Sequence, residues 1–204
     1  LASAMIKQLD AAWAVGTNAG GLDTGTIAGD TWYHVFLIGR SDTGVVDVLF
    51  SLSPTAPTLP TNYTEQRRIG SILTDATPDI LAFSQRGDEF LWGVPVNDIS
   101  QAPSTSAQTL ALTVPTGIQV MWNGAASFVD TSPTIATKIL ISSLDTTDTD
   151  PSTAWNVYGG DDAGTLAAGG SALTIRTDTS AQVRARANQA TDRTMDLNTL
   201  GWLD

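Results

Sequence analysis

The only histidine of the 204-residue chain is His34, and the chain contains no cysteine. A Cys–His catalytic pair is therefore impossible, and a Ser-His-Asp triad would have to be built on His34. His34 lies between Tyr33 and Val35 in a pattern typical of a β-strand, and no local motif marks a serine or an aspartate as its partner. We interpret His34 as a hydrogen-bonded histidine of the core or of an interface, and we do not expect hydrolysis through such a triad.

Carboxylates are the other groups that could catalyse a reaction without a cofactor. Glycosidases need two acids about 5 to 10 Å apart with unequal pKa values. The only glutamates, Glu65 and Glu89, lie in no recognisable acid–base signature, whereas aspartate is abundant. The sequence therefore favours a protein that is not an enzyme and needs no cofactor. A polysaccharide depolymerase that uses a carboxylate pair stays an alternative.

An aspartate-rich run between residues 145 and 162 surrounds two aromatic residues and has poor strand periodicity. Carboxylate oxygens could hold calcium, and an aromatic ring in an exposed loop could contact a sugar. EF-hand spacing is missing, so we favour a solvated loop whose Asp, Thr, Pro and Gly residues form turns. The calcium candidates are Asp145, Asp148 and Asp150. The predicted ligand-binding residues are Trp155, Asn156, Tyr158, Asp161 and Asp162.

Alternating apolar residues predict antiparallel strands along most of the chain. The segment 32–38 is apolar on both faces and 46–52 on one face, with the turn signal Ser41-Asp42-Thr43-Gly44 between them. The clearest predicted hairpin joins 109–114 to 118–122 through Pro115-Thr116-Gly117. Further strands are predicted at 69–73, 80–84, 90–94, 139–141, 173–175 and 181–187, with a hairpin turn at 85–88.

These patterns predict an all-β chain that forms an antiparallel, jelly-roll-like β-sandwich. We expect a single domain over residues 1–204, with a lobe boundary near 102–104 as an alternative. Apolar residues of 1–13 recur at three- and four-residue steps, which fits one short helix, and an edge strand is the competing interpretation. The glycine-rich segment 15–29 is predicted to be a loop. Five tryptophans, at 13, 32, 92, 122 and 202, are expected in the core or at a subunit interface.

The charge of the chain excludes some partners. A formal net charge of −11 and a pI near 4.2 argue against binding of DNA or RNA, because neutralising phosphates requires a surplus of Lys and Arg. No apolar run approaches the roughly 20 residues that cross a bilayer, so membrane insertion is not expected. Arg184 and Arg186 share one face of the last predicted strand and are expected to meet aspartates across strands or subunits.

Part of this pattern resembles a segment near the C-termini of bacteriophage and prophage tail fibres and related receptor-binding virion proteins. The matching residues are Trp32-Tyr33-His34-Val35-Phe36, the Val46-Asp47 step, the loop from Leu59-Pro60 to Tyr63, Arg67-Arg68-Ile69-Gly70, and the stretches 83–92 and 182–186. The resemblance covers most of the chain and rests on structural residues, not on a catalytic signature.

The resemblance implies a structural and host-attachment (receptor-binding) module of a virion appendage. Such a protein is made in the bacterial host cytoplasm and resides in the virion. It is expected to form a homotrimer, to contact a bacterial cell-surface polysaccharide or protein receptor, and to join other virion proteins through a missing N-terminal region. A purely structural capsid or baseplate component is a further alternative.

Overall fold

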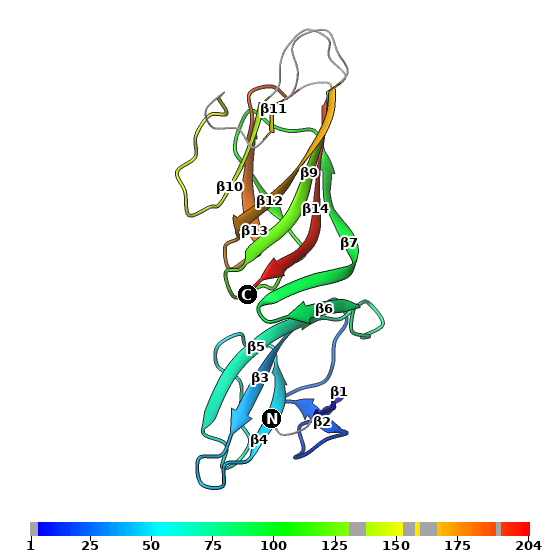
Figure 1. The fold of residues 1–204 in the computed structure, drawn as a ribbon, viewed down its shortest axis with the longest axis vertical. Coiled ribbons are helices and arrows are strands. Elements are labelled where there is room, and N and C mark those ends of the chain that lie inside the picture. The colour runs from blue at the N-terminus through cyan, green and yellow to red at the C-terminus, as the bar shows by residue number, and fades with distance from the viewer. Residues whose placement is uncertain (1–3, 131–137, 153–157, 160–166, 191–192) are drawn as a thin grey trace. The chain divides into compact units, whose positions relative to one another are not determined.

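The computed structural model of the chain describes residues 4–130, 138–152, 158–159, 167–190 and 193–204. Regular secondary structure in these ranges consists of β-strands and includes no helix, so the predicted all-β class is confirmed. The strands form three sheets in two compact units, 1–81 and 82–204 (Figure 1). The sequence suggested one domain with an alternative boundary near 102–104. The structure divides the chain after Leu81, and 102–104 connects two strands within the second unit.

The first unit contains one five-stranded sheet in the order β1-β2-β4-β3-β5. Its strands are β1 (Lys7–Ala12), β2 (Ala19–Leu22), β3 (Trp32–Gly39), β4 (Val46–Ser51) and β5 (Glu65–Leu73). β3 pairs antiparallel with both of its neighbours, whereas β1 and β2 are added in parallel. The β3–β4 hairpin turns where the sequence predicted it, at Gly44, whose φ of 69° favours glycine.

The predicted N-terminal helix is wrong, because residues 7–12 form the edge strand β1, the competing interpretation. Along β1, Lys7, Leu9 and Ala11 turn inward, and the residues between them are exposed. Because the inward residue Lys7 is polar, the alternation of inward and outward residues does not appear as an alternation of apolar and polar residues in the sequence. The parallel partner β2 was predicted as loop, yet its glycines permit close approach: a Cβ on Gly20 would lie 2.1 Å from the carbonyl oxygen of Ala12.

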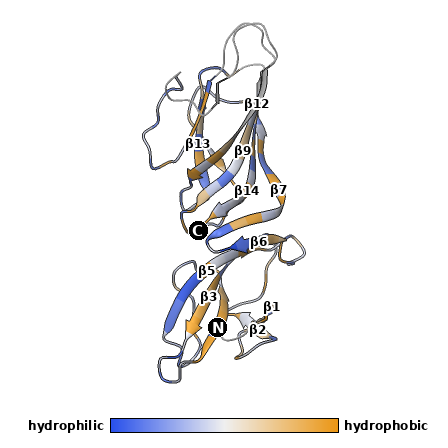
Figure 2. Cartoon of the chain, viewed as in Figure 1, coloured by the Kyte–Doolittle hydropathy of each residue, from blue (hydrophilic) through white to orange (hydrophobic). Residues whose placement is uncertain are grey.

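The core of the first unit lies on one face of the β3–β4 hairpin. Phe36, Ile38, Leu49 and Tyr63 form a buried cluster, and Trp13 packs against it. Figure 2 shows β3 as hydrophobic along most of its length and the beginning of β5 as hydrophilic. β3 buries Phe36 and Ile38 on one face and Tyr33 on the other, and the more polar β5 lies at the edge of the sheet.

The second unit contains two antiparallel sheets. The five-stranded sheet has the order β12-β9-β14-β7-β6, and the four-stranded sheet has the order β11-β10-β13-β8. Buried residues alternate along β10 and β13, the pattern of a β-sandwich with one face inward. The strands are β6 (Phe83–Arg86), β7 (Glu89–Gln101), β8 (Gln108–Ala111), β9 (Met121–Asp130), β10 (Lys138–Ser142), β11 (Tyr158–Gly159), β12 (Ala167–Arg176), β13 (Gln182–Ala187) and β14 (Arg193–Leu203).

The hairpin predicted between 109–114 and 118–122 is wrong. β8 pairs with β13 in the four-stranded sheet, whereas β9 pairs with β12 and β14 in the five-stranded sheet. The segment between them crosses from one sheet to the other and is paired with the turn near residues 177–181. Leu112 N–H donates to the Ala181 carbonyl at 2.9 Å, and Gly117 N–H donates to the Thr179 carbonyl at 2.7 Å. The hairpin predicted around 85–88 is confirmed, since β6 pairs with β7.

Stacked aromatic rings fill the core of the second unit, as the sequence predicted for most tryptophans. Trp122 and Trp202 have no exposed surface. The ring centroids of Trp202 and Phe90 are 4.8 Å apart with an interplanar angle of 6°, and Trp92 lies 5.2 Å from Trp202. None of the described segments forms a helix long and apolar enough to span a bilayer.

Candidate functional site

Most of the predicted ligand-binding residues lie outside the described residues. This applies to Trp155, Asn156, Asp161 and Asp162. The backbone of Tyr158 lies in β11, opposite Ile139 of β10, and its side chain is also outside the description. The ligand contact expected at these five residues stays a prediction.

The described beginning of the aspartate-rich run, residues 143–152, is a loop that follows β10 and is fastened to β13. Arg186 Nη1 lies 2.9 Å from Asp148 Oδ2, and Arg186 Nη2 contacts Asp150 Oδ1. Arg186 therefore pairs with aspartates of another segment, as the sequence predicted.

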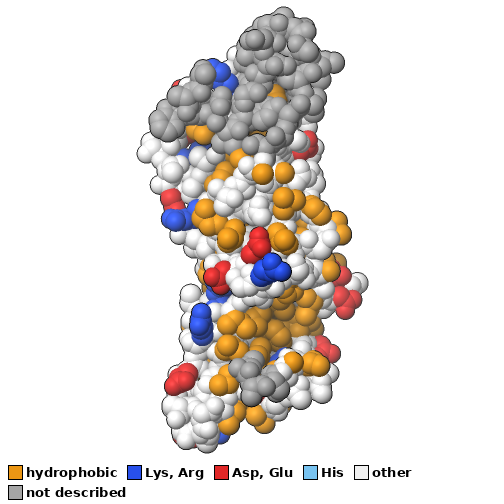
Figure 3. Space-filling view, in the orientation of Figure 1, with side chains coloured by type: hydrophobic (Ala, Val, Ile, Leu, Met, Phe, Trp, Pro, Cys, Tyr) orange, Lys and Arg blue, Asp and Glu red, His pale blue; other side chains and the backbone are white. Residues whose placement is uncertain are grey.

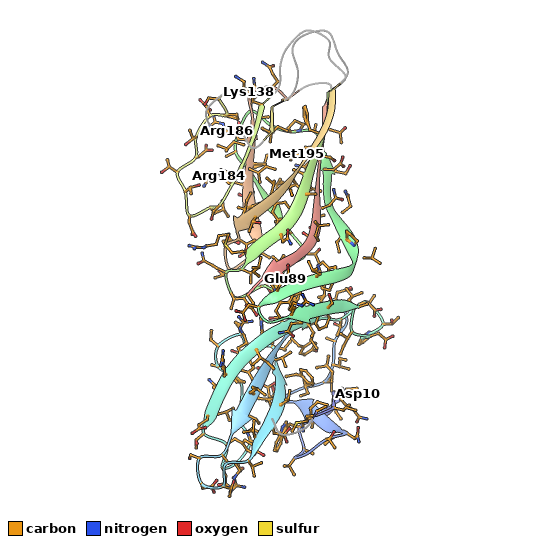
Figure 4. All side chains as sticks on the ribbon, in the orientation of Figure 1. Asp10, Glu89, Lys138, Arg184, Arg186 and Met195 are labelled. Atoms are coloured by element: carbon orange, nitrogen blue, oxygen red, sulfur yellow. The ribbon has the colours of Figure 1, made fainter. Side chains whose placement is uncertain are left out.

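A second arginine of β13 holds the same loop. Arg184 Nη1 donates a hydrogen bond to the carbonyl oxygen of Thr146 at 2.8 Å. Figure 4 shows Arg184 and Arg186 projecting from β13 on the side of this loop. The loop 143–152 is thus tied down at two points and is not a free surface segment.

The calcium candidates face cations. Asp148 and Asp150 are occupied by Arg186, while Asp145 Oδ2 lies 3.9 Å from Arg176 Nη1. In the ranges that the structure describes, no three His, Cys, Asp or Glu residues gather closely enough to hold a metal ion. The described carboxylates of the loop therefore serve as partners of arginine.

A hollow of about 500 Å³ lies between this loop and β10, and we call it the threonine hollow. Its volume falls in the range of about 300 to 1,000 Å³ that is usual for ligand pockets. Leu140 and Ser142 are on the outward side of β10, since their neighbours Ile139 and Ile141 are buried. Among the described residues, those that line it are Leu140, Ser142, Thr146, Thr147 and Thr149.

Two hydroxyl groups of the threonine hollow are available to a ligand. Thr146 Oγ1 donates to the Ser143 carbonyl at 2.8 Å, and Thr149 Oγ1 donates to the Thr147 carbonyl at 3.2 Å. The hydroxyls of Ser142 and Thr147 have no hydrogen-bond partner among the described residues. Each can donate one hydrogen bond and accept others from a solute.

The charges around the threonine hollow compensate one another. The loop carries three aspartates, and three arginines of β12 and β13 contact it: Arg176 lies near Asp145, Arg186 holds Asp148 and Asp150, and Arg184 donates to the Thr146 carbonyl. Figure 3 shows charged side chains on the visible face as scattered spots and adjacent opposite pairs, not as a patch of one sign. A largely apolar hollow with two free hydroxyl groups and no excess charge suits an uncharged ligand that carries both apolar C–H faces and hydroxyl groups, as a sugar does.

His34 has a serine partner that the sequence did not mark. The Nδ1 atom of His34 lies 2.9 Å from Ser71 Oγ on the neighbouring strand β5, and Arg68 Nη1 donates to the same oxygen at 3.3 Å. His34 is 1% exposed and Ser71 is 0% exposed. A solute does not reach this pair in the structure, so its geometry is that of a buried hydrogen bond, as the structural interpretation of His34 predicted.

A buried polar chain in the second unit was missed by the sequence analysis. Trp122 Nε1 donates to Thr199 Oγ1 at 2.7 Å, and the Thr199 hydroxyl donates to Asp98 Oδ2. Asp98 Oδ1 also accepts from the backbone N–H and the hydroxyl of Thr113, at 3.0 and 2.5 Å. These bonds join three strands and the crossing segment, so the carboxylate of Asp98 is engaged in structure.

A buried ion pair in the first unit was also missed. Lys7 Nζ lies 3.0 Å from Asp47 Oδ1, and the two side chains are 2% and 1% exposed. The ammonium also donates to the Ala14 carbonyl at 2.6 Å and lies 5.2 Å from the centre of the Trp13 ring. The Asp47 Oδ2 atom accepts from the backbone N–H of Gly16 at 2.9 Å. This pair fastens β1 and the following turn to β4.

Carboxylates in two turns have lowered pKa values. Backbone N–H donation from Asp79, followed by the hydroxyl and N–H of Thr77, holds the pKa of Asp75 below its usual range. The hydrogen bond from Arg40 lowers the pKa of Asp42. Both carboxylates are stabilised in their charged form, and each belongs to a turn of the first unit.

No protein-family model matches this sequence, and comparison with curated proteins finds no significant match.

Proposed function

We propose that this chain is a non-enzymatic host-attachment module of a bacteriophage tail fibre or a related virion appendage. In this proposal the threonine hollow binds an uncharged glycan of the bacterial surface. The observation that carries it is the presence of two unengaged hydroxyls, those of Ser142 and Thr147, in a hollow of about 500 Å³ beside loop aspartates that arginines already hold.

The chemistry of the hollow supports a sugar in preference to other ligands. Hydroxyl groups can exchange donor and acceptor roles with sugar hydroxyls, and the aliphatic Leu140 offers an apolar floor to the C–H face of a ring. A ligand that covers the half-buried Ser142 and the exposed Thr147 removes their hydroxyls from water, so a ligand without matching hydroxyls would leave them unpaired and bind more weakly.

The polar groups that could take part in catalysis are engaged in structural contacts, which supports a binding role. The Ser71–His34 pair is buried, and the loop aspartates are held by arginines. The resemblance to tail fibres also falls mainly on sheet residues, in β3, β4 and β5 of the first unit and in β6, β7 and β13 of the second. A rigid β-framework that presents a hollow with largely apolar walls and two free hydroxyl groups is suited to attachment.

The resemblance further leads us to propose a homotrimer whose copies join other virion proteins. Three identical copies would raise a weak affinity for a repeating glycan through multivalency. The mass of the protein in solution tests this part of the proposal, and a monomer at micromolar concentration would contradict it.

The test is saturable binding of the full chain to a panel of bacterial cells and their purified surface polysaccharides. Thr147→Val and Ser142→Ala each remove one free hydroxyl at nearly constant shape. Each is expected to weaken binding about two- to twelvefold, the effect of one hydrogen bond of about 0.5 to 1.5 kcal/mol.

Thr116→Val is the matched control, because Thr116 is exposed in the same unit and does not line the threonine hollow. It should leave binding unchanged. Release of reducing ends from a polysaccharide would replace the attachment role by that of a depolymerase. No saturable binding to any member of the panel would favour a purely structural virion component.

A further inference from the structure

A second hollow adjoins the threonine hollow. It has a volume of about 310 Å³ and lies at the end of β13. The loop 143–152 contributes to both hollows: Thr149 lines the first, and the next two residues, Asp150 and Pro151, line the second. The second hollow is lined, in the part of the chain that the structure describes, by Thr105, Asp150, Pro151, Arg186, Ala187 and Asn188.

The sheet register places the two hollows side by side. Leu140, in the first hollow, is the direct cross-strand partner of Arg186, in the second. Side chains of directly opposed residues in an antiparallel pair stand about 4.5 to 5.5 Å apart at their Cβ atoms. One continuous surface therefore leads from the floor of the threonine hollow to the guanidinium group of Arg186.

Arg186 keeps hydrogen-bonding capacity for a ligand. Its Nε donates to the Thr105 carbonyl at 2.9 Å, Nη1 to Asp148 at 2.9 Å, and Nη2 to Asp150. A guanidinium carries five N–H groups. Three contacts use three of them, so two N–H groups have no partner among the residues that the structure describes.

The charge of the second hollow argues against an anionic ligand. Two aspartates surround the single positive charge of Arg186, so this small group has an excess of negative charge. An acidic sugar would be repelled by them, whereas sugar hydroxyls can accept from the two remaining N–H groups.

We infer that the site takes an uncharged oligosaccharide chain that spans both hollows, and not a single terminal sugar. One sugar unit occupies the threonine hollow and a following unit lies beside Arg186. This inference rests on the proposed function, since it concerns the length and charge of the glycan that the attachment module binds.

The test uses fragments of one to four sugar units cut from a polysaccharide that binds the full-length chain, with affinities measured by calorimetry. Affinity is expected to rise about tenfold once a second unit can reach Arg186, which corresponds to one or two additional hydrogen bonds. Fragments that carry a carboxylate on the second unit should bind more weakly than neutral ones.

Thr105→Met fills the second hollow and keeps the backbone carbonyl that accepts from Arg186 Nε. It should abolish the rise in affinity with length and leave binding of single sugar units unchanged. Thr147→Val should weaken binding of short and long fragments alike. Equal affinity for short and long fragments, or equal weakening of both by Thr105→Met, would overturn the inference while the attachment role stands. If the unmodified chain binds no glycan of any length, the proposed function itself is refuted.

Discussion

The buried pair of Lys7 and Asp47 makes a quantitative prediction about the first unit. Lys7→Met removes the ammonium and keeps an aliphatic chain of similar length, which leaves the Asp47 carboxylate at 1% exposure without its cation. Breaking a buried ion pair by removal of one partner costs about 3 to 5 kcal/mol. We therefore expect the free energy of unfolding to fall by about that amount. The backbone amides of the edge strand β1 should be the first to lose their protection against hydrogen exchange.

The same reasoning predicts strong coupling between the two positions. In the double variant Lys7→Met/Asp47→Leu no charge is left buried, so the variant should be more stable than Lys7→Met alone. Replacement of a buried pair by apolar residues of similar volume is often neutral or stabilising. The interaction energy from the double-mutant cycle should exceed about 1 kcal/mol.

The assay is urea denaturation of the full chain, with NMR signals of residues 4–81 used to assign the transition to the first unit. Asp10→Asn is the matched control, because Asp10 is an exposed carboxylate on the same strand (Figure 4). It should change stability by less than about 0.5 kcal/mol. The reasoning fails if Lys7→Met costs no more than this control, or if the double variant loses the sum of the two single losses.

Two further predictions concern backbone packing and a turn carboxylate. Gly201→Ala should destabilise the second unit by about 3 kcal/mol or more, because a Cβ there would lie 1.9 Å from the Phe90 carbonyl oxygen. Gly87→Ala should cost only about 1 to 2 kcal/mol, because its Cβ meets open space and the sole penalty is a φ of 60°. Equal melting temperatures of these variants would contradict the packing argument. Thr77→Val should raise the pKa of Asp75 toward its usual value in an NMR titration, since one of the hydrogen bonds that lower it is removed. Because the folded pKa lies below the unfolded one, this carboxylate stabilises the fold above the unfolded pKa and loses that effect as the pH falls through the folded pKa. An unchanged pKa would show that the Thr77 hydroxyl does not stabilise the charged form.

Local signals predicted the hairpins whose strands are joined by short turns. The β3–β4 and β6–β7 pairs combine alternating apolar residues with Gly44 or Gly87 at positions of positive φ. Both the strands and the turn are encoded within a short stretch of sequence, so periodicity and turn chemistry are sufficient.

The predicted pairing of 109–114 with 118–122 failed for the opposite reason. Alternation identifies a strand and does not identify its neighbour, and here the partners of β8 and β9 lie far along the chain. Pro115 and Gly117 fit a hairpin turn, yet they lie in a segment that crosses from one sheet to the other. The pairing partners of β8 and β9 are determined by burial against residues far away in the sequence, and a local pattern contains no information about such contacts.

The candidate site was only partly predictable. The expected meeting of Arg186 with aspartates located the loop that forms it, since a row of arginines on one strand face needs acidic partners. Ser142 and Thr147 carry no such signal, because they are common residue types whose importance depends on lacking partners in the folded chain. Lys7 misled the sequence analysis because a lysine is ordinarily exposed.

The place of β14 in its sheet has a consequence for biosynthesis. β14 lies between β9 and β7, so the last strand of the chain is an inner strand of the five-stranded sheet. On a ribosome, residues 82–190 must wait with the inner edges of β7 and β9 uncovered until residues 193–203 emerge, whereas the strands of the first unit are complete by Leu73. Nascent chains that stall before residue 193 would expose two unpaired β-edges, which is the condition that favours aggregation.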